Sequence, residues 1–114
     1  MNRRDFTKKI STLILEMIAD GNYPVIDYAL RSREEQKRLY DLGASKCDGE
    51  VKISAHQKGM AMDIYFVVTR EDGTVHIDYD YKETSDLAVK YHARLVQMGG
   101  EPMIDWDKCH YEGR

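Results

Sequence analysis

The chain has 114 residues and a mass of 13.3 kDa, with 42% hydrophobic and 32% charged residues. This length suits one domain, and the hydrophobic content argues against an intrinsically disordered chain. A net charge of −3 without a long Lys/Arg run disfavours a nucleic-acid binder, and no segment approaches the roughly 20 apolar residues of a membrane span.

A helix is the first predicted element. Apolar residues recur at helical spacing from Phe6 to Ile18. The pair Arg3 and Arg4 resembles a twin-arginine export signal, but Glu16 interrupts the apolar stretch that an export signal requires. We therefore expect a core helix here, in a chain that is made in the cytoplasm without a clear cleavable signal.

A short strand and a second helix are expected next. Residues 25–30 are rich in β-branched and aromatic side chains, which favours a strand. Ser32 and Glu35 have the spacing of a capping box, so a helix should begin after Ser32 and end at Gly43. Residues 43–55 are mostly polar, which is typical of a loop.

The strongest strand pattern covers residues 60–68. Its alternation places Ile64 and Phe66 on one face of a sheet and Asp63 and Tyr65 on the other. The second face carries a charge in the middle of the strand, so we expect it to serve a purpose other than packing.

The remaining elements complete the expected fold. Residues 71–74 predict a hairpin turn that leads into a strand at 75–78. A third helix is expected at about 84–98, closed by Gly99, and residues 103–104 are expected to form a short last strand. Helices and antiparallel strands in separate runs indicate an α+β fold, with a small antiparallel sheet and flanking helices.

A histidine and an aspartate flank the start of the strongest strand. On one helix, the seven residues from His56 to Asp63 would span about 10.5 Å, whereas the ligands of one metal ion each lie about 2 Å from it. Only a turn between them lets both side chains reach one ion. Gly59 provides the backbone freedom for such a turn.

A second polar cluster lies near the C-terminus, where Asp107 and His110 are three residues apart. One helical turn or a tight loop would direct both into one cleft. Two histidines and one carboxylate from separate segments make a zinc site with an open fourth position, and a further carboxylate is then placed to accept a proton. Cys109 is an alternative fourth ligand, although adjacent Cys and His side chains rarely both reach one ion.

Together these patterns resemble the zinc peptidases of the M15 family. The motif Ser-x-His-x-x-Gly-x-Ala-x-Asp runs from Ser54 to Asp63, and an acid three residues before a histidine follows it. The family includes D-Ala-D-Ala carboxypeptidases and the L-alanyl-D-glutamate endopeptidases of phage endolysins. The resemblance implies a single zinc peptidase domain over residues 1–114, with the fold of the D-Ala-D-Ala peptidases and of Hedgehog-type zinc proteins.

The resemblance also implies a ligand set and two weaker contacts. One Zn²⁺ per chain is expected, bound by His56, Asp63 and His110. Ser54 and Gln36 match frequent but less diagnostic positions, which are expected to contact substrate.

Catalytic roles are implied for two further residues. Asp107 is expected to be the general base, with Asp105 as an alternative, and Arg31 is expected to contact substrate or stabilise charge on the tetrahedral intermediate. Relatives that are carboxypeptidases often carry Glu at the position of Asp107, so the aspartate favours the endopeptidases.

The function implied is zinc-dependent hydrolysis of peptide bonds in the stem peptides of bacterial peptidoglycan, of the L-alanyl-D-glutamate or the D-Ala-D-Ala type. The alternative is a non-catalytic zinc-binding interaction module of the same superfamily, which would not need the acid at Asp107. We expect a monomer with no nucleic-acid partner and no membrane span. It would act at the cell wall, after release during phage lysis or after export.

Overall fold

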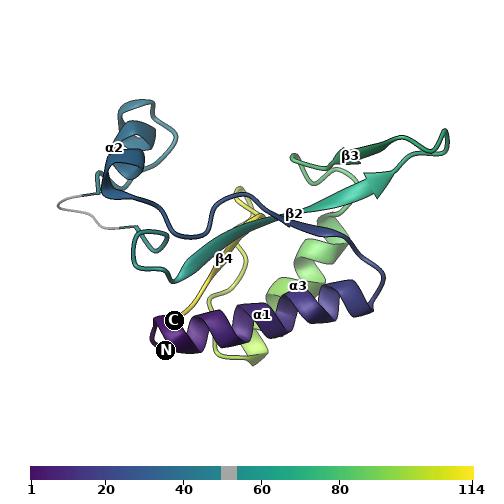
Figure 1. The fold of residues 1–114 in the computed structure, drawn as a ribbon, viewed down its shortest axis with the longest axis horizontal. Helices are drawn as coiled ribbons and strands as arrows, with labels where there is room; N and C mark the ends of the chain where they lie inside the picture. Colours follow the sequence, from purple (N-terminus) through teal and green to yellow (C-terminus); the bar gives the residue numbers. More distant parts are fainter. Residues whose placement is uncertain (50–53) are drawn as a thin grey trace.

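The described residues, 1–49 and 54–114, form an open antiparallel sheet of four strands and three helices in the computed structural model (Figure 1). The helices are α1 (Arg3–Ala19), α2 (Arg33–Asp41) and α3 (Ser85–Gln97). The strands are β1 (Pro24–Ile26), β2 (Ala61–Thr69), β3 (Val75–Ile77) and β4 (His110–Glu112). This architecture is the α+β class that the sequence predicts.

Strand β2 is the centre of the sheet, because each of the other three strands pairs with it. On one edge, the backbone of Asp63 bonds to Tyr28 and Asp27, in the segment that continues β1. On the other edge, the amide of Ile64 donates to the carbonyl of Cys109, just before β4. Strands β4 and β3 therefore follow one another along the edge opposite β1.

One face of the sheet carries the hydrophobic core. Ile64 and Phe66 point into it from β2 and are fully buried. Helices α1 and α3 lie on this side of the sheet (Figure 1). Their buried contributions to the core are Phe6, Ile10, Leu13 and Met17 from α1 and Ala88, Tyr91 and Leu95 from α3.

The opposite face of the sheet is not covered by α1 or α3 (Figure 1). Asp63 and Tyr65 lie on it, together with the side chains that β4 directs to the same side. Helix α2 stands apart from the other two helices, towards the N-terminal end of β2 (Figure 1). We call this side, which carries neither α1 nor α3, the open face of the sheet, although Asp63 on it is only 9% exposed.

Most predicted elements are confirmed, with differences at the short ones. The predicted strand at 25–30 is shorter, and the loop predicted at 43–55 lies partly outside the described residues. The predicted capping box forms only half: Ser32 Oγ accepts from the amide of Glu35, but the Glu35 carboxylate accepts from Tyr28 and Arg38 instead.

The predicted strand at 103–104 is wrong. The last strand is β4, which begins at His110. Pro102 has no amide hydrogen to offer a neighbouring strand, and Met103 packs against the core instead. Among the described residues, no helix has the length and apolar character needed to cross a membrane.

Candidate metal centre

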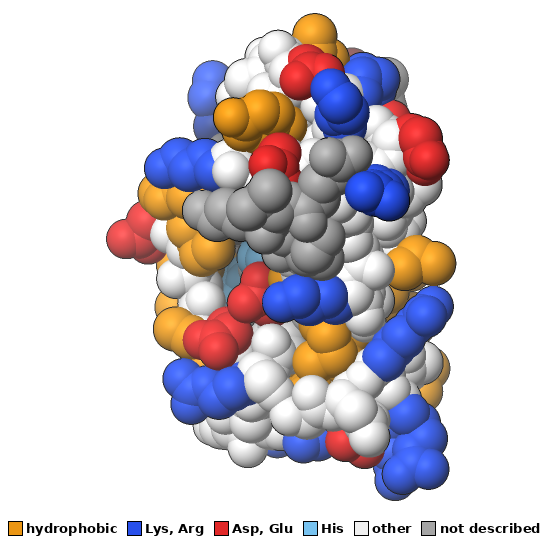
Figure 2. All heavy atoms as spheres, turned by 90° about the vertical axis from the view of Figure 1, so that its left-hand side faces the viewer, with side chains coloured by type: hydrophobic (Ala, Val, Ile, Leu, Met, Phe, Trp, Pro, Cys, Tyr) orange, Lys and Arg blue, Asp and Glu red, His pale blue; other side chains and the backbone are white. Residues whose placement is uncertain are grey.

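Three side chains from separate segments converge on the open face of the sheet. They belong to His56, in the turn before β2, to Asp63 in β2 and to His110 in β4. One potential ligand atom from each lies within 4.8 Å of the others. In Figure 2, histidine surface is visible in a recess next to acidic and basic side chains.

A tight turn brings His56 back to β2. The amide of Gly59 donates to the carbonyl of His56, and the amide of Met60 donates to that of Ala55. Gly59 has φ = 68°, in the left-handed region that favours glycine. The predicted turn between His56 and Asp63 is confirmed.

Strand pairing brings His110 to Asp63. The two residues are direct partners across the antiparallel β2–β4 pair. Both backbone hydrogen bonds of Asp63 go to the other edge, towards Asp27 and Tyr28. Asp63 and His110 are therefore a non-hydrogen-bonded pair, the kind in which opposite side chains approach most closely.

The distances between ligand atoms match the edges of a metal coordination polyhedron. The Nε2 atom of His56 lies 3.2 Å from Oδ1 of Asp63, and Nδ1 of His110 lies 3.6 Å from the same oxygen. Ligands about 2.0–2.1 Å from a tetrahedral ion stand about 3.3–3.4 Å apart. The buried Nε2 of His56 has no hydrogen-bond partner among the described residues. This group of residues could hold a metal ion.

Each of the three side chains has an outer contact on the side away from the other two. Nδ1 of His56 lies 3.1 Å from the carbonyl oxygen of Ala29, and Nε2 of His110 lies 3.0 Å from Oε1 of Glu112. The second carboxylate oxygen of Asp63 lies 3.9 Å from Nη2 of Arg31. Such outer contacts are the usual means of orienting metal ligands.

The electrostatics of the metal-free site follow from these contacts. Burial opposes ionisation of Asp63, but His110 and His56 outweigh it and hold the pKa of the carboxyl well below its usual range. Burial alone would lower the pKa of His110, whereas the carboxylates of Asp63 and Glu112 raise it to about 9. At neutral pH the metal-free site therefore holds an ionised Asp63 beside a protonated His110, and a bound cation would have to displace a proton from the His110 ring.

Arg31 and Gln36 form a buried polar network beside the three ligands. The guanidinium of Arg31 donates to Oε1 of Gln36 at 2.7 Å and lies over the ring of Tyr28. Gln36, fully buried in α2, donates to Oγ of Ser45 and to the carbonyl of Cys47. Nε of Arg31 is buried without a partner among the described residues.

Asp107 lies in the segment that precedes β4. Its Oδ1 accepts from the thiol of Cys109 at 3.3 Å, and its backbone carbonyl accepts from the amide of His110. Asp107 lines a cavity of about 310 Å³ together with Asp105, Tyr65 and other residues. Its carboxylate is not part of the three-residue ligand group.

Cys109 does not belong to the ligand group either. Burial and the nearby Asp63 and Asp107 raise the pKa of its thiol, which favours the protonated form over the thiolate that binds metals. The alternative of Cys109 as a fourth ligand is therefore not supported.

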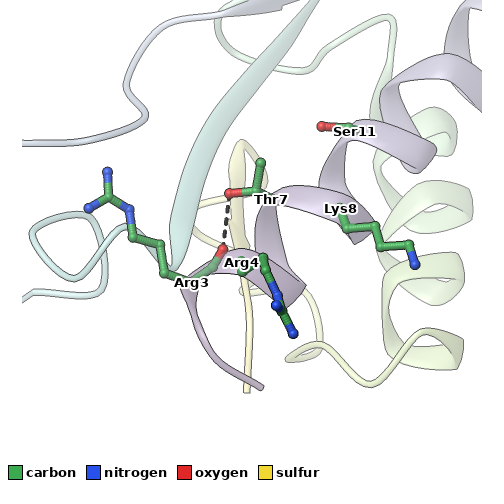
Figure 3. Close-up of a pocket in the computed structure, with 5 residues that line it drawn as sticks. All are labelled: Arg3, Arg4, Thr7, Lys8 and Ser11. Atoms are coloured by element: carbon green, nitrogen blue, oxygen red, sulfur yellow. Dashed lines mark hydrogen bonds between the residues drawn. The ribbon is translucent and has the colours of Figure 1, made fainter.

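The remaining candidates lie outside the ligand group. Ser54 accepts from and donates to Gln57, and so stabilises the turn that carries His56. A hollow of about 630 Å³ on the outer face of α1 is lined by Arg3, Arg4, Thr7, Lys8 and Ser11. In Figure 3 the long side chains of this hollow diverge, so they do not converge on a ligand.

Two contacts of the site escaped the sequence analysis. The contact with the carbonyl of Ala29 could not be predicted, because every residue has a backbone oxygen and the sequence does not show which one a side chain will meet. Glu112 could have been found, since the alternation His-Tyr-Glu places its side chain on the face of His110 once the segment is read as a strand.

No protein-family model and no curated protein matches this chain. The resemblance to the zinc peptidases therefore rests on the motif residues of the sequence alone.

Proposed function

We propose that this chain is a zinc-dependent peptidase that hydrolyses stem peptides of bacterial peptidoglycan. The observation that carries the proposal is the convergence of His56, Asp63 and His110, with 3.2 and 3.6 Å between their ligand atoms. Two histidines and one carboxylate leave a coordination position open, which is the pattern of a catalytic zinc site rather than a closed structural one.

Bound zinc would supply Lewis-acid activation of water and of a peptide carbonyl. The chain would contribute the rest through its own side chains. Asp107 would accept a proton from the attacking water and return it to the leaving amine. Arg31 would stabilise negative charge on the tetrahedral intermediate, and its contact with Asp63 also gives it a role in orienting that ligand.

The substrate class comes from the resemblance of residues 54–63 and 107–110 to the M15 peptidases. Aspartate at position 107 favours cleavage between L-alanine and D-glutamate over release of a terminal D-alanine. Asp105 and Asp107 line the same cavity, but His56, Asp63 and His110 are not among the residues that line it, so Asp105 stays the alternative to Asp107 as the base.

Metal analysis tests the centre itself. Purified protein should contain about one zinc per chain, and His56→Ala should remove it. His76, which lies in β3 and contacts Glu83, provides the matched control, so His76→Ala should keep the metal. Iron also binds two histidines and a carboxylate. Iron in place of zinc, or a full zinc content in His56→Ala, would overturn the proposal.

Digestion of purified peptidoglycan tests the reaction. The wild type should release peptides with new termini, and Asp107→Ala should reduce the rate by about 10²–10⁴-fold, the usual contribution of a general base. Asp105→Ala is the matched control and should retain activity. If Asp105→Ala loses activity instead, Asp105 is the base.

The identity of the new termini decides the subclass. A new amino group on D-glutamate supports the endopeptidase, and free D-alanine supports the carboxypeptidase. No release by zinc-loaded wild type would contradict the peptidase and support the non-catalytic zinc-binding module.

A further inference from the structure

The two ring nitrogens of His110 have different surroundings. Nδ1 faces Asp63, 3.6 Å from Oδ1, while Nε2 lies 3.0 Å from Oε1 of Glu112. A carboxylate only accepts hydrogen bonds, so Nε2 must carry a hydrogen to make this contact. In the neutral ring that a metal ion requires, the lone pair is then on Nδ1, which faces the ligand group. The contact therefore determines which nitrogen of His110 is available to a metal.

In His56 the other ring nitrogen, Nε2, faces the ligand group. Its Nδ1 lies against the carbonyl oxygen of Ala29, so the hydrogen sits on Nδ1 and the lone pair of Nε2 faces Asp63. The backbone supplies the outer acceptor for His56, whereas a side chain supplies it for His110. The orientation of His110 is thus open to change by a single substitution.

The fold holds Glu112 in place for this contact. His110 and Glu112 are two residues apart in β4, so both side chains lie on the open face. Glu112 pairs across the sheet with Ala61, and its carboxylate lies 3.0 Å from Nε2 of His110. The carbonyl of Glu112 accepts from the amide of Glu101, which fixes the end of the strand.

We propose that Glu112 is a positioning residue of the metal centre, which orients His110 so that Nδ1 rather than Nε2 binds the metal. The inference rests on the metal centre of the proposed function, but not on the peptidase reaction. It does not require Glu112 to touch either the metal or a substrate.

Zinc affinity of the full chain, measured by competition with a chromophoric chelator, tests the proposal. Glu112→Gln should weaken zinc binding by about 10–100-fold, the usual effect of removing an outer carboxylate. Glu101→Gln is the matched control, because Glu101 is equally exposed (35% against 34%) and pairs with Arg114 instead of a ligand. Its affinity should stay within about twofold of wild type, as the Arg114 contact is a surface ion pair.

A spectroscopic measurement on the wild type keeps the proposal testable even if Glu112→Gln folds poorly. Long-range ¹H–¹⁵N spectra of the zinc-loaded protein should identify Nδ1 of His110 and Nε2 of His56 as the metal-bound nitrogens. Zinc bound through Nε2 of His110, or an unchanged affinity in Glu112→Gln, would overturn the role of Glu112 and leave the peptidase standing. Absence of zinc binding by the wild type would overturn both.

Discussion

Tyr81 and Tyr111 are buried tyrosines whose hydroxyl groups have different surroundings. The Tyr81 hydroxyl donates to the carbonyl of Ile64, whereas the Tyr111 hydroxyl has no hydrogen-bond partner among the described residues. A buried hydroxyl without a partner costs about 1–3 kcal/mol, and a satisfied one contributes about 1 kcal/mol. Tyr111→Phe should therefore raise the free energy of unfolding or leave it unchanged, while Tyr81→Phe should lower it by about 1 kcal/mol. Urea unfolding of both variants checks this, and an equal loss in both would contradict it.

His92 makes the stability of the fold depend on pH. It is buried in α3, stacks on Tyr111 at 3.8 Å between ring centroids, and has Nε2 2.7 Å from the carbonyl oxygen of Lys108. Burial lowers the pKa of His92 below its usual 6.5, so the folded state holds the neutral ring. Its contribution to stability is complete above pH 6.5 and is lost as the pH falls below that value, since the unfolded chain then binds the proton more tightly.

The variant His92→Phe isolates this effect. At pH 7 it should lower the free energy of unfolding by about 1 kcal/mol, because the carbonyl of Lys108 loses its donor. At pH 5 the difference from wild type should shrink, since the variant has no buried imidazole to protonate. Urea unfolding of metal-free protein at both pH values measures it, with His76→Phe as the control. A difference that stays constant with pH would contradict the role of His92.

At the residue scale, the candidate ligand side chains could be predicted from the sequence, whereas the backbone groups that contact them could not. His56 and Asp63 could be proposed as ligands because their spacing requires a turn and a glycine lies between them. Their exact surroundings depend on the carbonyl of Ala29 and on the pairing of β2 with β4, which arise only when distant segments meet.

At the scale of elements, two glycines with left-handed φ angles can show whether the turn before β2 positions His56. Gly59 (φ 68°) lies in the turn that carries His56, and Gly73 (φ 86°) lies in the β2–β3 hairpin with open space around it. Alanine in the left-handed region costs about 1–2 kcal/mol. Both Gly59→Ala and Gly73→Ala should therefore lower the free energy of unfolding by about that amount.

Only one of these two substitutions should affect the metal centre. A Cβ at Gly59 would stand 2.6 Å from Nε of Arg3, an exposed and flexible side chain that can move aside. The turn itself must relax because alanine disfavours φ = 68°, and His56 moves with the turn. Gly59→Ala should weaken zinc binding, and Gly73→Ala should leave it unchanged in the same chelator competition. Equal zinc affinities in the two variants would show that the turn does not position His56.

The elements themselves were predictable in proportion to their length. Helices α1 and α3 and strand β2 each bury a periodic set of side chains, so their patterns are strong. Strand β4 has three residues, of which only Tyr111 is an apolar core residue, and it exists through its pairing with β2. A segment of that length carries no periodicity that could distinguish it from the residues at 103–104.

On the scale of the whole molecule, the site combines segments that are distant in the chain. The turn at 54–59, strand β2 and strand β4 each supply one ligand, and α2 supports Arg31 through Gln36. Helices α1 and α3 cover only the opposite face of the sheet (Figure 1). The residues that stabilise the core and the residues that form the site are therefore different sets, and substitutions at the ligands should not unfold the chain.

A metal held by three such segments should stabilise the entire fold. A ligand that binds only the folded state at 100 times its Kd adds about 2.7 kcal/mol to the free energy of unfolding, which for a chain of this size is about 10 °C in Tm. Zinc should raise the Tm of the metal-free wild type by that amount and leave the Tm of His110→Ala nearly unchanged, while His76→Ala should respond like wild type. His110 is one of the three candidate ligands. An equal rise in the Tm of His110→Ala would therefore mean that zinc binds elsewhere on the molecule, and the proposed centre would have to be abandoned.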